Sequence, residues 1–200
     1  MFEGPASGGT RPVKPAKTNP SAEYAHATAK LSGQLILEVG GQRVKTKLDQ
    51  NLYQTQEPFY SGTSYELFLD NDQPAYVYVI SSDLSQKCNL LFPLQAQTPM
   101  VGGVFERYAL PGNNRMYTLD YNRGKDYLCV LYSRKPIAIE SVMQKMASTH
   151  GNFIQRLYRV MGDDIVPASH IQYKNDGKLS FSAAATTGAI VPIVLEIEHI

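Results

Sequence analysis

Cysteine and histidine side chains are the first candidates for chemistry, because a thiolate activated by a nearby imidazole is a strong nucleophile. In caspases the cysteine has Gln-Ala-Cys-x-Gly surroundings. Cys88 lies in Gln-Lys-Cys-Asn and Cys129 lies inside an apolar run, so neither matches that pattern. The nearest alternative pairs Cys129 with His150 and with the acidic pair at residues 163–164. The cysteine pattern therefore predicts no peptidase site in this chain.

Serine, metal and phosphate chemistry also lack their motifs. Ser, His and Asp combinations can be drawn, but no Gly-x-Ser-x-Gly elbow is present. The histidines are scattered and no Cys-x-x-Cys pair exists, so a zinc site has no ligand spacing, and Gly102-Gly103 precedes no helix start that could cradle a phosphate. Asp70-Asn71-Asp72 lacks the twelve-residue calcium loop, and we interpret it as a turn capped by its own side chains. The sequence predicts neither metal nor cofactor.

Two residue pairs are candidate binding residues. Asp163 and Asp164 follow a predicted helix end, where the helix dipole disfavours acids, so a cation or a partner's Arg or Lys is expected nearby. A solvated loop is the alternative for this pair. Tyr76 and Tyr78 alternate with valines in one predicted strand and offer large rings with polar tips. A packing role is the alternative for the tyrosines.

Composition limits the class of protein. The 200 residues suit one domain, and 43% hydrophobic residues can fill a core. No apolar run reaches the roughly 18 residues of a transmembrane helix. Lys+Arg 19 against Asp+Glu 18 leaves a net charge of +1 without a basic cluster, which argues against nucleic-acid binding. The 13 Tyr and no Trp favour an all-β surface built on hydroxyls.

Residues 1–20 are rich in Pro and Gly and cannot bury apolar surface, so we expect a disordered linker there. They contain no apolar stretch of a secretory signal. Two interpretations stay open: a chain that has lost a signal or an upstream domain, and a disordered tail native to a cytosolic protein. A short helix is expected over residues 21–31.

Short β-rich segments separated by turn residues dominate the rest of the chain. Gln34–Val39 and Val44–Leu48 flank Gly40-Gly41, which predicts a hairpin. The cysteines both fall in predicted strands, and one disulfide or two buried thiols are both open. Such spacing predicts an antiparallel β-sandwich, immunoglobulin-like or related. Further strands are expected at residues 65–69, 75–80, 88–92, 107–110, 115–119 and 126–132.

The last third of the chain adds helices and more strands. Apolar residues at helical spacing predict one or two helices over 139–161, packed on the sandwich. A turn at Asn175-Asp176-Gly177 predicts a second hairpin. The segment from Ile190 to Ile200 is a last strand that begins at an edge, because it contains Pro192. Its apolar end pairs either inside its own sheet or with a partner.

A series of short motifs between Tyr60 and Pro136 carries a family resemblance. These motifs are Tyr60-Ser61-Gly62, Tyr65-Glu66-Leu67, residues 75–79, Leu90-Leu91-Phe92-Pro93, Leu110-Pro111 and residues 126–133. With them the stretch resembles a bacterial family, domain of unknown function 4384 (DUF 4384). The resemblance implies a β-sandwich module, often attached to caspase-like peptidase domains or found in envelope-associated proteins. The family has no established catalytic residues to transfer.

We therefore expect residues 21–200 to form one non-enzymatic β-sandwich domain that serves as an interaction module, an accessory part of a larger bacterial protein or assembly. Its partner would be a protein, such as a caspase-like peptidase or an envelope component, and any peptidase activity would reside in that partner or another domain. The resemblance favours the periplasm or envelope over the cytoplasm. The alternative is a carbohydrate- or peptidoglycan-binding domain that uses tyrosines on a sheet face. An uncharacterised hydrolase would need a pocket that gathers His with Cys or Asp.

Overall fold

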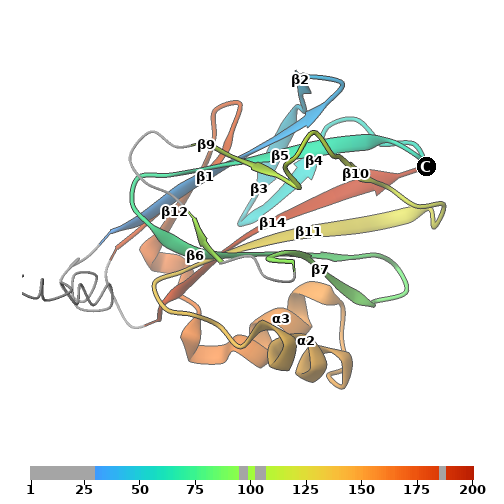
Figure 1. Cartoon of the computed structure of the whole chain (residues 1–200). Coiled ribbons are helices and arrows are strands. Elements are labelled where there is room, and N and C mark those ends of the chain that lie inside the picture. Colours follow the sequence, from blue (N-terminus) through green and yellow to red (C-terminus); the bar gives the residue numbers. More distant parts are fainter. Residues whose placement is uncertain (1–29, 95–98, 102–106, 185–187) are drawn as a thin grey trace, which may run out of the picture.

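Two seven-stranded sheets pack face to face, and two helices cover the outer face of one of them (Figure 1). The computed structural model describes residues 30–94, 99–101, 107–184 and 188–200. The fold is mainly β and mostly antiparallel, as the spacing of the strand signals predicts. None of the helices described in these ranges is long and apolar enough to cross a membrane. The expected linker at residues 1–20 lies outside the described residues, as does the short helix expected over 21–31 except at its end, where Leu31 begins a strand.

The first sheet, sheet A, has the strand order β10-β5-β1-β13-β12, with β2 added to β1 and β9 added to β5. All of its pairings are antiparallel. In β5 every second residue is buried, which is the pattern of a strand with one face on a core. The strands are β1 (Leu31–Val39), β2 (Gln42–Arg43), β5 (Ser64–Asn71), β9 (Arg107–Leu110), β10 (Tyr117–Thr118), β12 (Ile171–Asn175) and β13 (Leu179–Ala183).

The second sheet, sheet B, has the order β3-β4-β14-β11-β6-β7, with β8 added to β6. β11 and β14 pair along ten residues each, and most of their residues are buried because both faces of this sheet are covered. β14 pairs in parallel with β4 on its other side. The strands are β3 (Thr46–Asp49), β4 (Leu52–Thr55), β6 (Ala75–Ser82), β7 (Cys88–Phe92), β8 (Met100–Val101), β11 (Gly124–Ser133) and β14 (Ile190–His199).

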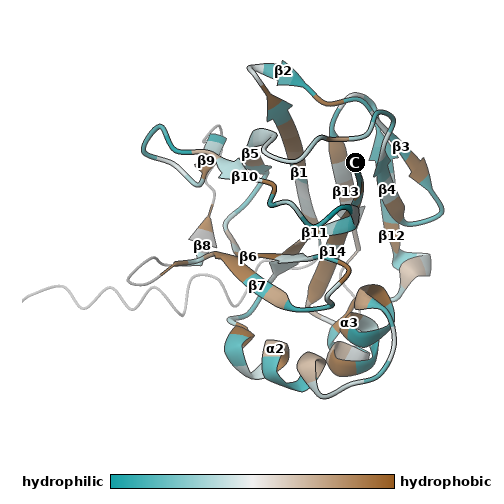
Figure 2. Cartoon of the chain, turned by 90° about the vertical axis from the view of Figure 1, so that its right-hand side faces the viewer, coloured by the Kyte–Doolittle hydropathy of each residue, from teal (hydrophilic) through white to brown (hydrophobic). Residues whose placement is uncertain are grey.

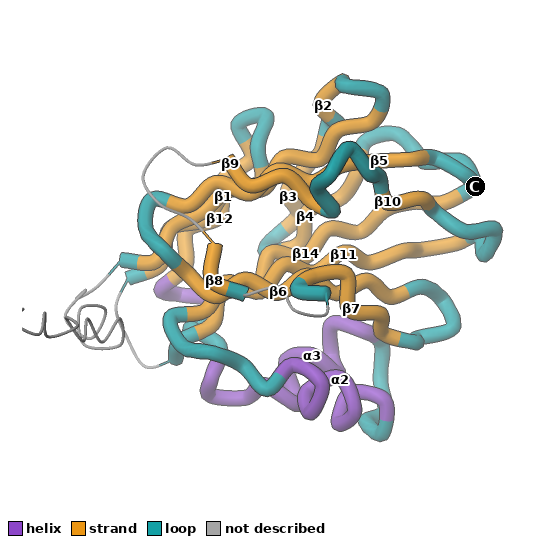
Figure 3. Tube along the Cα trace, viewed as in Figure 1, coloured by secondary structure: helices purple, strands orange, loops and turns teal. Residues whose placement is uncertain are grey.

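Two hydrophobic cores result from these three layers. Along β6, Val77 and Val79 enter the core between the sheets, whereas Tyr78 and Ile80 enter a second core under the helices α2 (Ile139–Ala147) and α3 (Phe153–Met161). Figure 3 shows both helices together on one side of the sandwich. Figure 2 shows hydrophobic stretches in β1 and β14 and hydrophilic residues in many connections. The predicted helices and the alternation of β6 are confirmed.

Tyrosine hydroxyls tie sheet A to sheet B across the first core. In each case a ring spans the core and its hydroxyl meets backbone carbonyls of the opposite sheet or its edge. A buried hydroxyl needs such a partner, so the tyrosines fill volume and satisfy polar groups together. The ties run from Tyr53 to Lys174 and Ser180 at 2.9 and 2.8 Å, from Tyr132 to Gln34 at 3.1 Å, from Tyr173 to Pro192 at 2.8 Å and from Tyr117 to Leu91 at 3.1 Å.

One predicted pairing is wrong. Gly40 and Gly41, with φ of 58° and 74°, do make a two-residue hairpin turn, but its second arm is only β2. The chain then leaves sheet A, and Thr46–Asp49 pairs with β4 in sheet B instead of continuing the hairpin. The alternating pattern over Val44–Leu48 correctly indicates a strand, but alternation does not specify which sheet the strand joins.

The apolar part of the last strand is part of the sandwich interior. Ile193–Ile197 lies in β14 between β11 and β4, so pairing inside its own sheet is the correct alternative. Ile190 also forms a parallel bridge to Ile165, and between Ile190 and Val194 the strand pairs, within the described residues, with β11 alone, which is where Pro192 lies. Cys88 and Cys129 are both free thiols, and Cys129 is fully buried.

Candidate functional site

The face of sheet B that carries Tyr76 and Tyr78 is covered by the helices. Tyr78 is 2% exposed, and its hydroxyl accepts a hydrogen bond of 2.9 Å from the backbone N–H of Ile137. Burial raises the pKa of Tyr78. Tyr76 is partly buried and packs against the same core. The two rings position the chain that enters α2 rather than present a face to a ligand.

The acidic pair lies in the 3-10 turn η2 (Gly162–Asp164) that follows α3. Asp164 Oδ1 lies 2.7 Å from Lys135 Nζ, so the cation expected near this pair comes from the same chain. Both of these side chains are more than half exposed, and such pairs contribute little to stability. Asp163 is exposed. The Lys135–Asp164 ion pair is therefore a weak contact between the turn after α3 and the segment after β11.

Three residues that no sequence motif connects meet at the end of the sandwich. His199, near the end of β14, has Nδ1 2.8 Å from Asp126 Oδ2 in β11 and Nε2 3.0 Å from Ser61 Oγ. A carboxylate only accepts hydrogen bonds, so Nδ1 donates to Asp126 and, in neutral imidazole, Nε2 accepts from Ser61. This is the order of contacts found in Ser-His-Asp hydrolases.

The surroundings of these residues do not support acyl transfer. The backbone N–H of Ser61 donates to the Ile200 carbonyl at 3.3 Å, and that of Gly62 donates to the Leu119 carbonyl at 3.1 Å. Neither N–H is therefore free to stabilise an oxyanion. The His199 side chain is 0% exposed, so it cannot pass a proton to a leaving group without rearrangement. We call Ser61, Asp126 and His199 the His199 clamp, because they join the ends of β14 and β11 to the segment before β5.

The other arrangement considered from sequence does not form a site. Cys129 is fully buried among apolar residues, and burial raises its pKa, which disfavours the nucleophilic thiolate. His150 is exposed between the two helices. Among the described residues, no hydrogen bond or ion pair joins Cys129 to His150.

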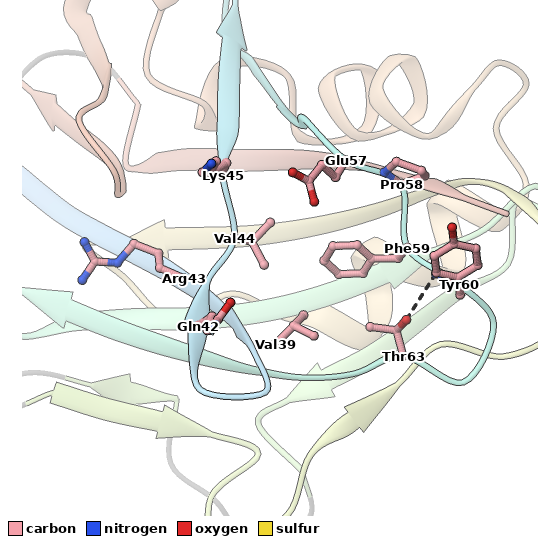
Figure 4. A pocket seen from close by; sticks show the side chains of 10 residues that line it. All are labelled: Val39, Gln42, Arg43, Val44, Lys45, Glu57, Pro58, Phe59, Tyr60 and Thr63. Atoms are coloured by element: carbon pink, nitrogen blue, oxygen red, sulfur yellow. Dashed lines mark hydrogen bonds between the residues drawn. The ribbon is translucent and has the colours of Figure 1, made fainter.

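Figure 4 shows a cavity of about 370 Å³, and two of its lining residues, Phe59 and Tyr60, directly precede Ser61 of the clamp. One wall is the hairpin of β1 and β2 with the chain that leaves it, and the other is the segment between β4 and β5. Val39, Val44 and Phe59 point toward one another at its centre (Figure 4). We call this cavity the hairpin groove. Its other lining residues are Gln42, Arg43, Lys45, Glu57, Pro58, Tyr60 and Thr63.

The hairpin groove combines an apolar floor with a charged rim. Arg43 and Lys45 lie on one side and Glu57 on the other, so cations outnumber anions (Figure 4). Tyr60 is 67% exposed, and its backbone N–H donates to Thr63 Oγ1 at 3.2 Å. Sequence reasoning missed this groove. Its only sequence signal is the alternation of Lys45 and Lys47 with less polar residues, which indicates a solvent-facing side of the strand but does not show what lies opposite.

At Arg43 the strand β2 has β1 on one side and no other described strand on its other side. The backbone N–H of Val44 donates to the Leu37 carbonyl at 2.9 Å. Bonded and non-bonded pairs alternate in an antiparallel ladder, so the N–H and C=O of Arg43 point away from β1. Two residues further along the chain, the Lys45 carbonyl accepts a hydrogen bond of 3.0 Å from the Gln56 N–H, so the backbone is paired again there. Arg43 also lines the groove, so this edge borders it.

Comparison with known proteins identifies one part of the chain. Residues 58–136 match the family described as "Domain of unknown function (DUF4384)". Searches of the curated proteins and of the solved structures each found no match. The matched residues supply β5, β9 and β10 of sheet A and β6, β7, β8 and β11 of sheet B. The match agrees with the resemblance found between Tyr60 and Pro136. The chain therefore contains a DUF4384 domain at residues 58–136.

Proposed function

We propose that this chain is a non-catalytic interaction module of a larger bacterial assembly, and that its hairpin groove binds an extended segment of a partner protein. The observation that carries the proposal is the open strand edge at Arg43 beside an apolar floor. An extended peptide that adds to such an edge gains main-chain hydrogen bonds, and pockets for its alternate side chains give specificity.

The rim of the groove specifies the charge of that segment. Two basic residues, Arg43 and Lys45, line the groove against one acidic residue, Glu57, so the groove favours a peptide with an acidic residue beside apolar ones. The exposed ring of Tyr60 extends the apolar surface past the groove. Aromatic and Arg side chains are the residue types that most often dominate binding energy at protein interfaces.

The sealed clamp supports a binding role over a catalytic one. His199 is buried, and the N–H groups of Ser61 and Gly62 are already hydrogen-bonded. Both thiols have pKa values raised by burial, which keeps them protonated at neutral pH. None of these groups is presented to a substrate in an activated form.

The test is a capture experiment with the full chain from lysate of the native host. The groove variant Arg43→Glu/Lys45→Glu is compared with the control Lys87→Glu/Lys145→Glu, which makes the same charge change at exposed positions on the helical side. We expect wild type and control to capture the same protein and the groove variant to lose it. A peptide from that protein should bind the groove variant about tenfold more weakly. Capture that is unchanged in the groove variant would refute the proposal.

A further inference from the structure

A second cavity, of about 260 Å³, lies at the same end of the sandwich, between the sheets. Its lining includes the carboxylates of Asp83, Asp120 and Asp126 and no Lys or Arg. We call it the acidic cavity. It is smaller than the roughly 300–1,000 Å³ of drug-sized pockets, so its ligand has the size of a single side chain.

Two tyrosine rings form one wall of the acidic cavity. Tyr65 and Tyr117 have ring centroids 5.6 Å apart with an interplanar angle of 39°. Aromatic faces attract cations electrostatically. The Tyr117 hydroxyl already has a hydrogen-bond partner, because it donates to the Leu91 carbonyl at 3.1 Å.

Tyr65 adds a hydroxyl to the polar groups of the acidic cavity. Its side chain is 5% exposed, belongs to the inner face of sheet A and lines the cavity. Among the described residues, none is hydrogen-bonded to its hydroxyl, unlike the four tyrosines that tie the sheets. Burial raises the pKa of Tyr65, so the phenol stays neutral and its oxygen can accept a hydrogen bond.

Among the described residues, no Lys or Arg forms an ion pair with Asp83, Asp120 or Asp126. Asp83 and Asp120 accept hydrogen bonds within their own turns, from the backbone N–H groups of Ser85 and Asn122. Burial raises the pKa of Asp126, and the charges of Asp120 and Asp83 raise it further against the effect of His199. The neighbouring Lys125 forms an ion pair with Glu196 instead, with Nζ 2.8 Å from Oε1. Asp126 uses Oδ2 in the clamp, and no described residue is bonded to its other oxygen. A positively charged ligand would relieve this repulsion.

We propose that the acidic cavity binds a protonated amine or guanidinium group on an alkyl arm, carried by a lysine or arginine side chain of a protein or by a free aliphatic amine. The alkyl arm lies against the tyrosine rings and the charged head meets the carboxylates and the Tyr65 hydroxyl. A metal ion fits less well, because the described residues contain no group of three His, Cys, Asp or Glu side chains able to hold one. This site is separate from the hairpin groove.

The test uses the ¹⁵N-labelled full chain and backbone amide chemical shifts. The probes are Nα-acetyl-lysine methylamide, Nα-acetyl-arginine methylamide and cadaverine, with Nα-acetyl-norleucine methylamide as the neutral control. We expect the charged probes to give saturable shifts at Tyr65, Leu119 and Leu128 in the millimolar range, and norleucine to give none. Binding by cadaverine alone supports the site with a free amine as the ligand, and binding by the amino-acid probes alone supports it with a protein side chain.

Variants separate charge recognition from general binding. Asp83→Asn/Asp120→Asn keeps a carbonyl oxygen at each turn and removes two charges, and it should weaken binding about tenfold. The control Asp49→Asn/Asp176→Asn removes two charges at exposed positions elsewhere and should bind as wild type does. Equal shifts with norleucine, equal affinity in both variants, or no saturable shift with any charged probe would each overturn the proposal. None of these outcomes depends on the hairpin groove.

Discussion

Replacing His199 with alanine should be among the most destabilising single substitutions in the chain. The side chain is 0% exposed and makes contacts of 2.8 Å with Asp126 and 3.0 Å with Ser61. A hydrogen bond to a charged group contributes about 1.5–3 kcal/mol and a neutral one about 1 kcal/mol. The substitution also leaves a cavity and an unpaired, mostly buried carboxylate. We expect the free energy of unfolding to fall by about 3–5 kcal/mol.

The measurement is urea unfolding at neutral pH, followed by circular dichroism, for wild type and the alanine variant. In thermal unfolding, the same loss of free energy lowers the midpoint temperature by about 10 °C in a chain of this length. His170→Ala is the control, because that histidine is exposed and should change stability by less than about 0.5 kcal/mol. Ser61→Ala should cost about 1 kcal/mol. A loss below about 1 kcal/mol for His199→Ala would refute the assignment of the clamp as a stabilising element.

Three further predictions follow from the fold. A fragment of residues 58–136 should show no cooperative unfolding in denaturant, because β5 and β11 lose the neighbours β1 and β14; a sigmoidal transition would contradict this. Cys88 and Cys129 should react slowly with Ellman's reagent in native buffer and rapidly in denaturant, because burial raises both pKa values. Burial raises the pKa of Asp126 above 3.8, so the folded chain holds this proton more tightly than the unfolded chain. The stability of wild type relative to Asp126→Asn should therefore fall as the pH rises from about 4 through the folded pKa. If urea unfolding shows that this stability difference rises with pH instead, burial of Asp126 does not control it.

Local patterns in the sequence predict the elements well. Ile139–Ala147 and Phe153–Met161 are helices because their apolar residues recur at helical spacing and can face one surface. The strand over Ala75–Ser82 follows from its run of β-branched and aromatic residues. The family resemblance depends on the same strands and is confirmed by the match at residues 58–136.

Long-range arrangement is what the sequence does not reveal. The clamp joins Ser61, Asp126 and His199 only because β11 and β14 pair in one register, with Gly124 opposite His199. Strand periodicity does not encode that register. The hairpin groove likewise needs the β1–β2 hairpin to lie beside the segment around Phe59, which belongs to a different part of the chain. Neither site has a local motif that could reveal it.

The central place of β14 has a consequence for the newly synthesised chain. β11 leaves the ribosome first, followed by both helices, and only then does its ten-residue partner emerge. Until that moment the apolar strand β11 has a bare edge, which is a template for aggregation. Such distant pairing also makes folding slow. A polypeptide that stops before Ile190 therefore exposes this edge permanently, and we expect chaperones and proteases to remove such products efficiently.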